Sequence, residues 1–288
     1  MRLPLGRDCG ELLMFDEVRR RLHLGMPQLE DERTIRVSDV IGTSGRARDF
    51  DACFQPRNKQ LADRIRQIRI NKPDAVNEPI DVLRMDRAYF VSDGHKRLSI
   101  AHATGMEFID ARVSSVPILY EMAPGVAQET IDHTSHERRF REETGLLSAV
   151  PGMRFAVSER HGYPELKEAI TSYGFELVQR LGRVLSREET AALWYEAVYR
   201  PTIAAAERQR FSTLLRCVTE ADLFLALHHQ SQELWGTEHA VRAEDADRLV
   251  STFLEQGTID DSVIAQLVRR ARRRKAPALL PERRPATN

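Results

Sequence analysis

The segment from Tyr89 to Leu98 joins a short apolar run, a glycine and a cationic stretch, a pattern typical of phosphate sites. Its apolar part predicts a strand, Gly94 predicts a turn, and the residues that follow have helical spacing. The first amides of a helix lack intrahelical acceptors and carry partial positive charge, so they attract anions. Gly94 would let a phosphate approach its backbone, and Lys96 and Arg97 add full charges. The sequence therefore predicts an anion site at this turn.

Two alternatives concern Asp93. The dipeptide Asp93-Gly94 is also a common hairpin signal, but a hairpin needs a strand after Gly94. Residues 95–104 have helical spacing instead and end at Gly105, so we favour a helix. The Asp93 carboxylate would either cap this helix or orient Arg97, and it is also a candidate catalytic base.

A second loop, residues 42–57, is rich in glycine, arginine and aspartate. Arg46 and Arg48 could reach a triphosphate, while Asp49 and Asp51 could hold Mg²⁺ and act in catalysis. The alternative is an ordered surface turn that is held by its own Arg–Asp pairs. Both interpretations remain open from the sequence alone.

The C-terminal end of the chain carries a strong positive charge. From Ser262 to Asn288 there are eight Lys or Arg residues and one acidic residue. This basic run would neutralise nucleic-acid phosphates without sequence preference, bind anionic lipid, or only interact with a helix dipole. Its candidate nucleic-acid contacts are Arg269, Arg270, Arg272, Arg273, Arg274 and Lys275.

Weaker patterns elsewhere favour structural roles. His133, His136 and Glu137 are ligand types at nearly helical spacing, but they lack the paired histidines of a zinc helix, so we expect no metal site. The aromatic residues of the C-terminal half lie in apolar helical stripes and predict core packing rather than base stacking. They are Trp194, Tyr195, Tyr199 and Phe224.

The composition is that of an ordinary globular protein. The 288 residues are 42% hydrophobic and 30% charged, and 43 basic residues balance 43 acidic ones. This excludes a wholly basic nucleic-acid binder and an acidic disordered chain. No apolar run approaches the roughly 20 residues of a membrane span, and the start resembles no secretory signal. Three isolated cysteines, Cys9, Cys53 and Cys217, predict a reduced cytoplasmic protein without disulfides.

Hydrophobic periodicity predicts an α/β region followed by an α-helical region. We expect an N-terminal helical brace in residues 1–33, a small mixed α/β domain in 34–118, a helical domain in 119–270 and a basic disordered tail in 271–288. Strands are predicted at 79–83, 88–91 and 108–113, with helices at 61–68 and 95–104. In the helical domain, Ser186 and Thr219 begin helices, Pro201 ends or kinks one, and Thr258 begins another.

Residues 34–116 resemble the N-terminal domain of the ParB/sulfiredoxin superfamily. Four stretches carry the resemblance, in the order of the family: Gln55-Pro56-Arg57, Leu61-Ala-Asp-Arg-Ile65, Glu78-Pro79-Ile80-Asp81-Val82, and Asp93-Gly94-His95-Lys96-Arg97-Leu98-Ser99-Ile100-Ala101. The resemblance implies a small α/β fold that binds a nucleoside triphosphate, ATP or CTP, with Mg²⁺ as its accompanying ion. It implies that Gly94 and Arg97 contact phosphate, with His95, Lys96 and the early-box Arg57 beside them.

The chain also departs from this family. His95 stands where sulfiredoxins have a reactive cysteine, so thiol chemistry at this turn is not expected. The E-N-x-x-R box and the helix-turn-helix of ParB proteins are both missing after Pro117. The helical region resembles an extension of ParB-like proteins to which no activity is assigned.

These observations favour a ParB-like nucleotide-binding switch without a helix-turn-helix. The alternatives are an NTP-dependent phosphotransferase or NTPase acting on a small molecule, and a non-enzymatic nucleic-acid-binding protein that uses its basic tail. The expected partners are a nucleotide, DNA and a second copy of the chain, with no membrane insertion.

Overall fold

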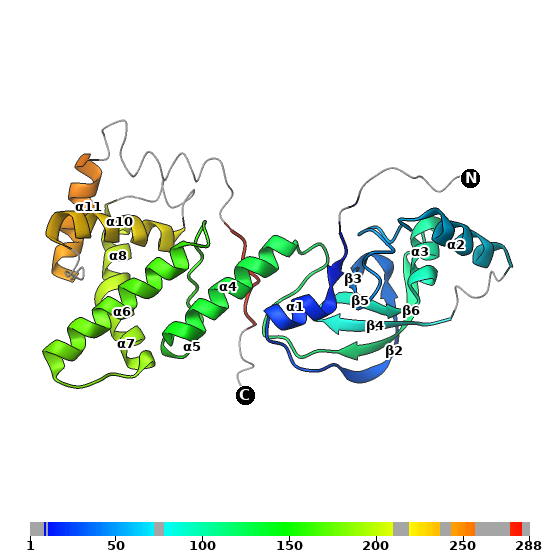
Figure 1. Cartoon of the computed structure of the whole chain (residues 1–288), viewed down its shortest axis with the longest axis horizontal. Coiled ribbons are helices and arrows are strands. Elements are labelled where there is room, and N and C mark those ends of the chain that lie inside the picture. The colour runs from blue at the N-terminus through cyan, green and yellow to red at the C-terminus, as the bar shows by residue number, and fades with distance from the viewer. Residues whose placement is uncertain are drawn as a thin grey trace. The chain divides into compact units, whose positions relative to one another are not determined.

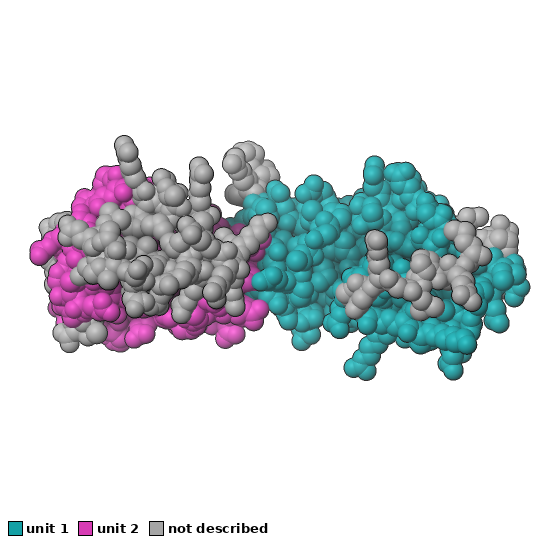
Figure 2. Space-filling model, turned by 90° about the horizontal axis from the view of Figure 1, so that it is seen from above, with its two compact units in different colours: residues 1–132, 280–288 teal, residues 133–279 magenta. Residues whose placement is uncertain are grey.

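The computed structural model describes residue 9 and residues 11–71, 78–209, 219–236, 243–256 and 277–283. The chain divides into two compact units, which Figure 2 distinguishes by colour. Unit 1 comprises Met1–Asp132 with Leu280–Asn288, and unit 2 comprises His133–Leu279. Unit 1 contains a mixed sheet with helices, and the described part of unit 2 is largely helical (Figure 1). The predicted fold class, α/β followed by α, is confirmed.

The sheet of unit 1 has six strands in the order β1-β3-β5-β4-β6-β2. Their bounds are β1 Leu13–Met14, β2 Gln28–Arg36, β3 Val40–Thr43, β4 Ile80–Met85, β5 Ala88–Asp93 and β6 Phe108–Ser115. The β1–β3, β3–β5 and β4–β6 pairs are parallel, whereas β4–β5 and β2–β6 are antiparallel. A short 3-10 turn, Val37–Asp39, links β2 to β3.

Helices pack against both faces of this sheet, because successive strand residues point in opposite directions. In β5, Phe90 packs in one cluster with residues of α1 (Phe15–Arg21). The next residue, Val91, packs in another cluster with residues of α2 (Lys59–Asn71) and α3 (His95–Thr104). This alternation holds α3 on the face where the predicted anion site begins.

The N-terminal segment differs from the helical brace expected for residues 1–33. The helix is restricted to Phe15–Arg21, and Leu13–Met14 adds a strand to one edge of the sheet. Gln28–Arg36 forms β2 at the opposite edge, although it is rich in charged residues. An edge strand tolerates charged side chains because they remain exposed, so the strand lacked the apolar pattern that predicts one.

The boundary between the units also lies further along the chain than the expected 118/119. Ile118, Tyr120, Met122 and Ile131 are buried in the same cluster as α1. This packing keeps the segment up to Asp132 with unit 1.

Two helices of unit 2 begin at the residues that the sequence signals indicated. Ser186 forms the predicted capping box with Glu189, and the Thr219 hydroxyl accepts from the amide of Asp222. The described helices are α4 Gln128–Thr144, which begins in unit 1, α5 Leu146–Ala149, α6 Gly162–Leu181, α7 Arg187–Trp194, α8 Arg200–Arg208, α10 Glu220–Trp235 and α11 Ala243–Gln256. The helix expected from Thr258 lies outside the described residues.

Pro201 does not end its helix, contrary to one of the two expectations. A π-helical turn, Tyr195–Tyr199, follows α7 and leads directly into α8, where Pro201 occupies the first turn. A proline at the start of a helix loses no bond that the helix needs.

The expectation of a disordered tail was wrong for residues 277–283. Leu280 is buried in the cluster that contains α1. The Glu121 amide donates to the Pro281 carbonyl at 2.7 Å, and the Arg283 amide donates to the Leu119 carbonyl at 2.7 Å. Arg283 also pairs with Asp86. Backbone pairing and one buried leucine therefore attach this segment to unit 1.

No helix in the described part of the chain is long and apolar enough to cross a membrane.

Candidate functional site

The sheet topology brings two predicted loops together. Strands β3 and β5 run parallel, with Thr43 opposite Val91, so their carboxyl ends lie side by side. The Ser44 amide donates to the Val91 carbonyl at 3.0 Å and ties the two ends to each other. Residues beyond Thr43 and beyond Asp93 therefore face one another, at the end of parallel strands where α/β proteins often bind ligands.

A pocket of about 380 Å³ lies at this point. Such a volume falls within the range of small-molecule sites, roughly 300–1,000 Å³. Its lining holds three cations and two carboxylates, and six of the predicted site residues belong to it. The lining residues are Arg46, Ile68, Glu78, Asp93, Gly94, His95, Lys96 and Arg97.

Gly94 adopts a left-handed conformation with φ of 93° and stands at the N-cap of α3. A Cβ at this position would lie 2.8 Å from the Cβ of Ile80. The structure therefore needs glycine for its conformation and for its close packing on β4, whereas the sequence pattern indicated only phosphate access. A helix follows Gly94, so the hairpin alternative is excluded.

The start of α3 offers backbone donors to the pocket. Its first intrahelical bond runs from the Leu98 amide to the Gly94 carbonyl at 3.0 Å. The three preceding amides, of residues 95–97, have no intrahelical acceptor, and no side chain caps this end. These donors and the helix dipole together favour an anion.

Arg97 connects three groups at the pocket by hydrogen bonds. Its guanidinium donates from Nη1 to the carbonyls of Glu78 at 3.1 Å and Pro79 at 2.6 Å, and from Nη2 to Asp93 Oδ2 at 3.0 Å. Its side chain is only 17% exposed. Of the two alternatives for Asp93, the structure shows the pairing with Arg97.

Two other cations are available to a ligand. Arg46, which follows β3, and Lys96, in the first turn of α3, both line the pocket. Neither side chain makes a hydrogen bond or ion pair with another residue in the described ranges. An anion that entered the pocket would not have to displace an internal carboxylate from either group.

His95 is buried, with 3% of its surface exposed, and it is one of the residues that line the pocket. Thr43 Oγ1 accepts from the amides of Gly45 at 3.1 Å and Arg46 at 3.2 Å, and lies 2.7 Å from His95 Nε2. A hydroxyl that accepts two amides directs its own proton toward the third partner, so Nε2 is the acceptor. Burial, and next the charge of Arg46, lower the pKa of His95 to about 4, which keeps the ring neutral.

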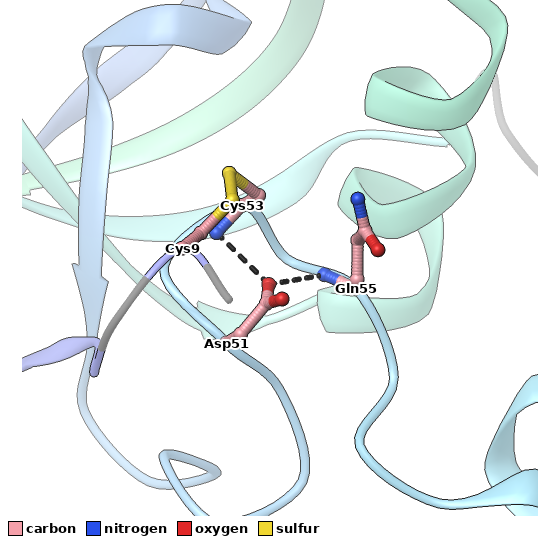
Figure 3. Close-up of a disulfide and its surroundings, with 4 residues drawn as sticks. All are labelled: Cys9, Asp51, Cys53 and Gln55. Atoms are coloured by element: carbon pink, nitrogen blue, oxygen red, sulfur yellow. Dashed lines mark hydrogen bonds between the residues drawn. A yellow bond between two sulfur atoms is a disulfide. The ribbon is translucent and has the colours of Figure 1, made fainter. Parts of the chain in front are cut away.

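The other predicted ligands of the first loop lie outside this pocket. Asp51 Oδ1 accepts from the amides of Cys53 at 2.9 Å and Gln55 at 2.8 Å (Figure 3), and Arg57 Nε donates to the Phe50 carbonyl at 3.0 Å. These two side chains stabilise the loop. Arg48 and Asp49 do not line the pocket either. Of the proposed catalytic carboxylates, only Asp93 lines the pocket.

The donor set for a protein-held metal is absent from the described ranges, where no three His, Cys, Asp or Glu side chains gather to hold an ion.

The remaining sequence patterns have structural outcomes or lie outside the described residues. Trp194, Tyr199 and Phe224 are buried in the core of unit 2, and Tyr195 packs against that core, as predicted. Glu137 is fully buried and accepts from Arg154 Nε at 3.1 Å. Cys217 and the basic residues Arg269, Arg270, Arg272, Arg273, Arg274 and Lys275 lie outside the described residues.

The expectation of reduced, unpaired cysteines was wrong. Cys9 and Cys53 form a disulfide with 5.7 Å between their Cα atoms (Figure 3). The two residues are 44 positions apart and belong to no recognisable motif. Their proximity follows from the parallel pairing of β1 with β3, which the expected N-terminal helix did not provide.

Sequence reasoning also missed three contributors to the site. Thr43 fixes the His95 ring, and Glu78 and Ile68 complete the pocket wall, although the sequence patterns gave none of the three a ligand-binding role. Only the pairing of distant strands and the packing of α2 bring them to this place.

Comparison of the chain with models of protein families found no match, and comparison with curated proteins found none either.

Proposed function

We propose that unit 1 binds a nucleoside triphosphate, with the phosphates at the start of α3. The observation that carries this proposal is the combination of three helix-start amides with two cations, Arg46 and Lys96, that have no partner among the described residues. Backbone donors and cations that converge at the end of parallel strands are the usual means of holding phosphate. The ParB-like order of motifs across residues 34–116 supports the same assignment.

The role we infer is a ParB-like regulatory switch that responds to nucleotide, in the cytoplasm where nucleotides are abundant. Asp93, the one proposed catalytic carboxylate in the pocket, is paired with Arg97 through Oδ2, a contact that orients this guanidinium. The arrangement therefore supports binding better than phosphoryl transfer. Contacts of the basic C-terminal run with DNA, and self-association, remain parts of this proposal.

Isothermal calorimetry with ATP, CTP and GTP tests the proposal on the full chain, with and without Mg²⁺. Adenosine, cytidine and guanosine serve as matched ligands without phosphates. We expect one triphosphate to bind with a Kd below about 100 μM and its nucleoside to bind at least tenfold more weakly, about 1.4 kcal/mol. Absence of binding by all three triphosphates at millimolar concentration would contradict the proposal. Phosphate release, measured in the same samples, separates a binder from an NTPase.

A further inference from the structure

The disulfide joins the N-terminal segment to the loop that carries Arg46. Residues 45–57, which we call the pocket loop, follow β3 and contain Cys53, while Cys9 precedes β1. Figure 3 shows the two sulfur atoms bonded beside Asp51, whose carboxylate receives the amides of Cys53 and Gln55. The covalent bond therefore lies within the hydrogen-bonded part of this loop.

The backbone next to Cys53 is held in an unfavourable conformation. Phe54 has φ of 54°, which is rare for residues other than glycine and costs on the order of 1 kcal/mol or more. Its amide donates to the Asp51 carbonyl at 2.9 Å. A tether at the adjacent residue helps to maintain this conformation, since the chain would otherwise relax toward a negative φ.

The pocket loop packs directly on α3. The ring of Phe50 stacks on His95 with centroids 5.8 Å apart, and the ring of Phe54 stacks on His102 at 5.5 Å. His95 and His102 are seven residues apart, so they lie on the same face of the helix. The loop thus connects the disulfide to the helix whose first amides line the pocket.

The position of Arg46 depends on this loop. On one side its amide is held by Thr43, and on the other its carbonyl accepts from the Asp49 amide at 3.0 Å. The Asp49 carbonyl in turn accepts from the Arg57 amide at 2.8 Å, which closes the loop around Cys53. Cys53 and Arg46 therefore belong to one hydrogen-bonded loop, in which the Arg46–Asp49 and Asp49–Arg57 backbone bonds enclose the segment that carries Cys53.

From these contacts we propose that the Cys9–Cys53 disulfide is a redox switch that sets the affinity of the phosphate pocket, an inference that rests on the proposed function. A cellular dithiol reduces the bond in a two-electron exchange: the S–S bond breaks, two cysteine thiols form, and the reductant becomes a disulfide. The reverse exchange with an oxidised dithiol restores it. In a reducing compartment, disulfides are usually redox-sensing rather than structural.

Reduction releases Cys53 from the N-terminal segment and removes the constraint on Phe54. The pocket loop then samples more conformations, so Arg46 is less often placed at the pocket. The oxidised protein is thus the tight-binding form. We expect reduction to weaken triphosphate binding about fivefold or more.

The test uses the full chain carrying Cys217→Ser, which leaves Cys9 and Cys53 as its thiols. Triphosphate affinity is measured by calorimetry on the oxidised protein, on the protein reduced with dithiothreitol, and on a Cys9→Ser, Cys53→Ser variant. Hydrogen exchange of the pocket loop is measured on the same samples without nucleotide. Exchange in β4 and β6 shows whether unit 1 remains folded, and the serine variant treated with dithiothreitol controls for the reagent.

Weaker binding after reduction and in the serine variant, with faster exchange confined to the pocket loop, supports the switch. Equal affinity in the oxidised and reduced forms overturns the switch and leaves the proposed function intact. If no triphosphate binds to either form, the proposed function fails, and the disulfide then has no triphosphate affinity to control. Hydrogen exchange of the oxidised and reduced proteins then tests the loop mechanism by itself. Unchanged exchange of the pocket loop after reduction overturns this mechanism, and faster exchange supports it.

Discussion

The Thr43 hydroxyl lies 2.7 Å from His95 Nε2, joining the end of β3 to the first residue of α3. Because the same hydroxyl accepts the amides of Gly45 and Arg46, one threonine orders both sides of the pocket. The hydrogen bond needs a neutral imidazole whose Nε2 carries no proton. Protonation of His95 at low pH should therefore break this hydrogen bond and disturb the pocket.

The stability of unit 1 should fall as the pH is lowered from about 6.5 toward 4. Burial lowers the pKa of His95 to about 4, so in this range the unfolded chain binds the extra proton and the folded chain does not. The stability that the neutral His95 ring contributes is complete above the pKa that this ring has in the unfolded chain. Below that pKa the free energy of unfolding decreases, by about 2 kcal/mol at pH 5. His95→Gln keeps an acceptor for Thr43 without titrating, so this variant should lose part of the acid sensitivity.

Urea unfolding at pH 5 and pH 8 measures this difference. Both tryptophans, Trp194 and Trp235, belong to unit 2, so tryptophan fluorescence reports on that unit and circular dichroism is needed for unit 1. Unit 2 has its own acid-sensitive group, since burial lowers the pKa of His228 to about 4. An equal acid response of unit 1 in His95→Gln and the parent chain would refute the role given to His95. Burial also lowers the pKa of His102, so some response should remain.

Gly94→Ala should destabilise unit 1 by about 3 kcal/mol. The residue would have to keep a φ of 93°, and its Cβ would meet Ile80. The left-handed conformation costs roughly 1–2 kcal/mol and the clash roughly 1–3 kcal/mol. Gly105→Ala is the matched control, because Gly105 also has a positive φ, 72°, but open space around it. Thermal unfolding followed by circular dichroism compares the two, and equal effects would show that packing on Ile80 is unimportant.

Arg97→Ala should destabilise unit 1 by about 2 kcal/mol, because it leaves two carbonyls and a carboxylate without their shared donor. Lys96→Ala, one residue earlier, should change stability by less than about 0.5 kcal/mol, since its ammonium has no partner among the described residues. Urea unfolding by circular dichroism separates the two. Similar stabilities for these variants would mean that Arg97 does not hold β4 to α3.

The turn at Gly94 could be predicted from the sequence because its signals are local. The apolar run of β5, the glycine and the helical spacing after it lie within 17 residues, and each element formed as expected. The capping box that begins α7 at Ser186 was recognisable for the same reason.

Features that depend on distant pairing could not be predicted in this way. Strand β2 is an exposed edge with charged residues, and the Cys9–Cys53 bond depends on β1 lying beside β3. Asp51 and Arg57 have the residue types of ligands, but backbone groups of their own loop satisfy them. Residue type alone does not reveal which charged groups are left free by the fold.

Arg46 and Lys96 are the residues on which the nucleotide proposal rests, so calorimetric titration of their variants tests it most directly. The series consists of the parent chain, Arg46→Ala, Lys96→Ala, the double variant, and Arg48→Ala as an exposed control from the same loop that does not line the pocket. Each charge-assisted contact to phosphate is worth about 1.5–3 kcal/mol, so each single variant should weaken triphosphate binding about tenfold or more. The account predicts that Arg48→Ala binds as the parent does. Parent-like affinity in the double variant would contradict it.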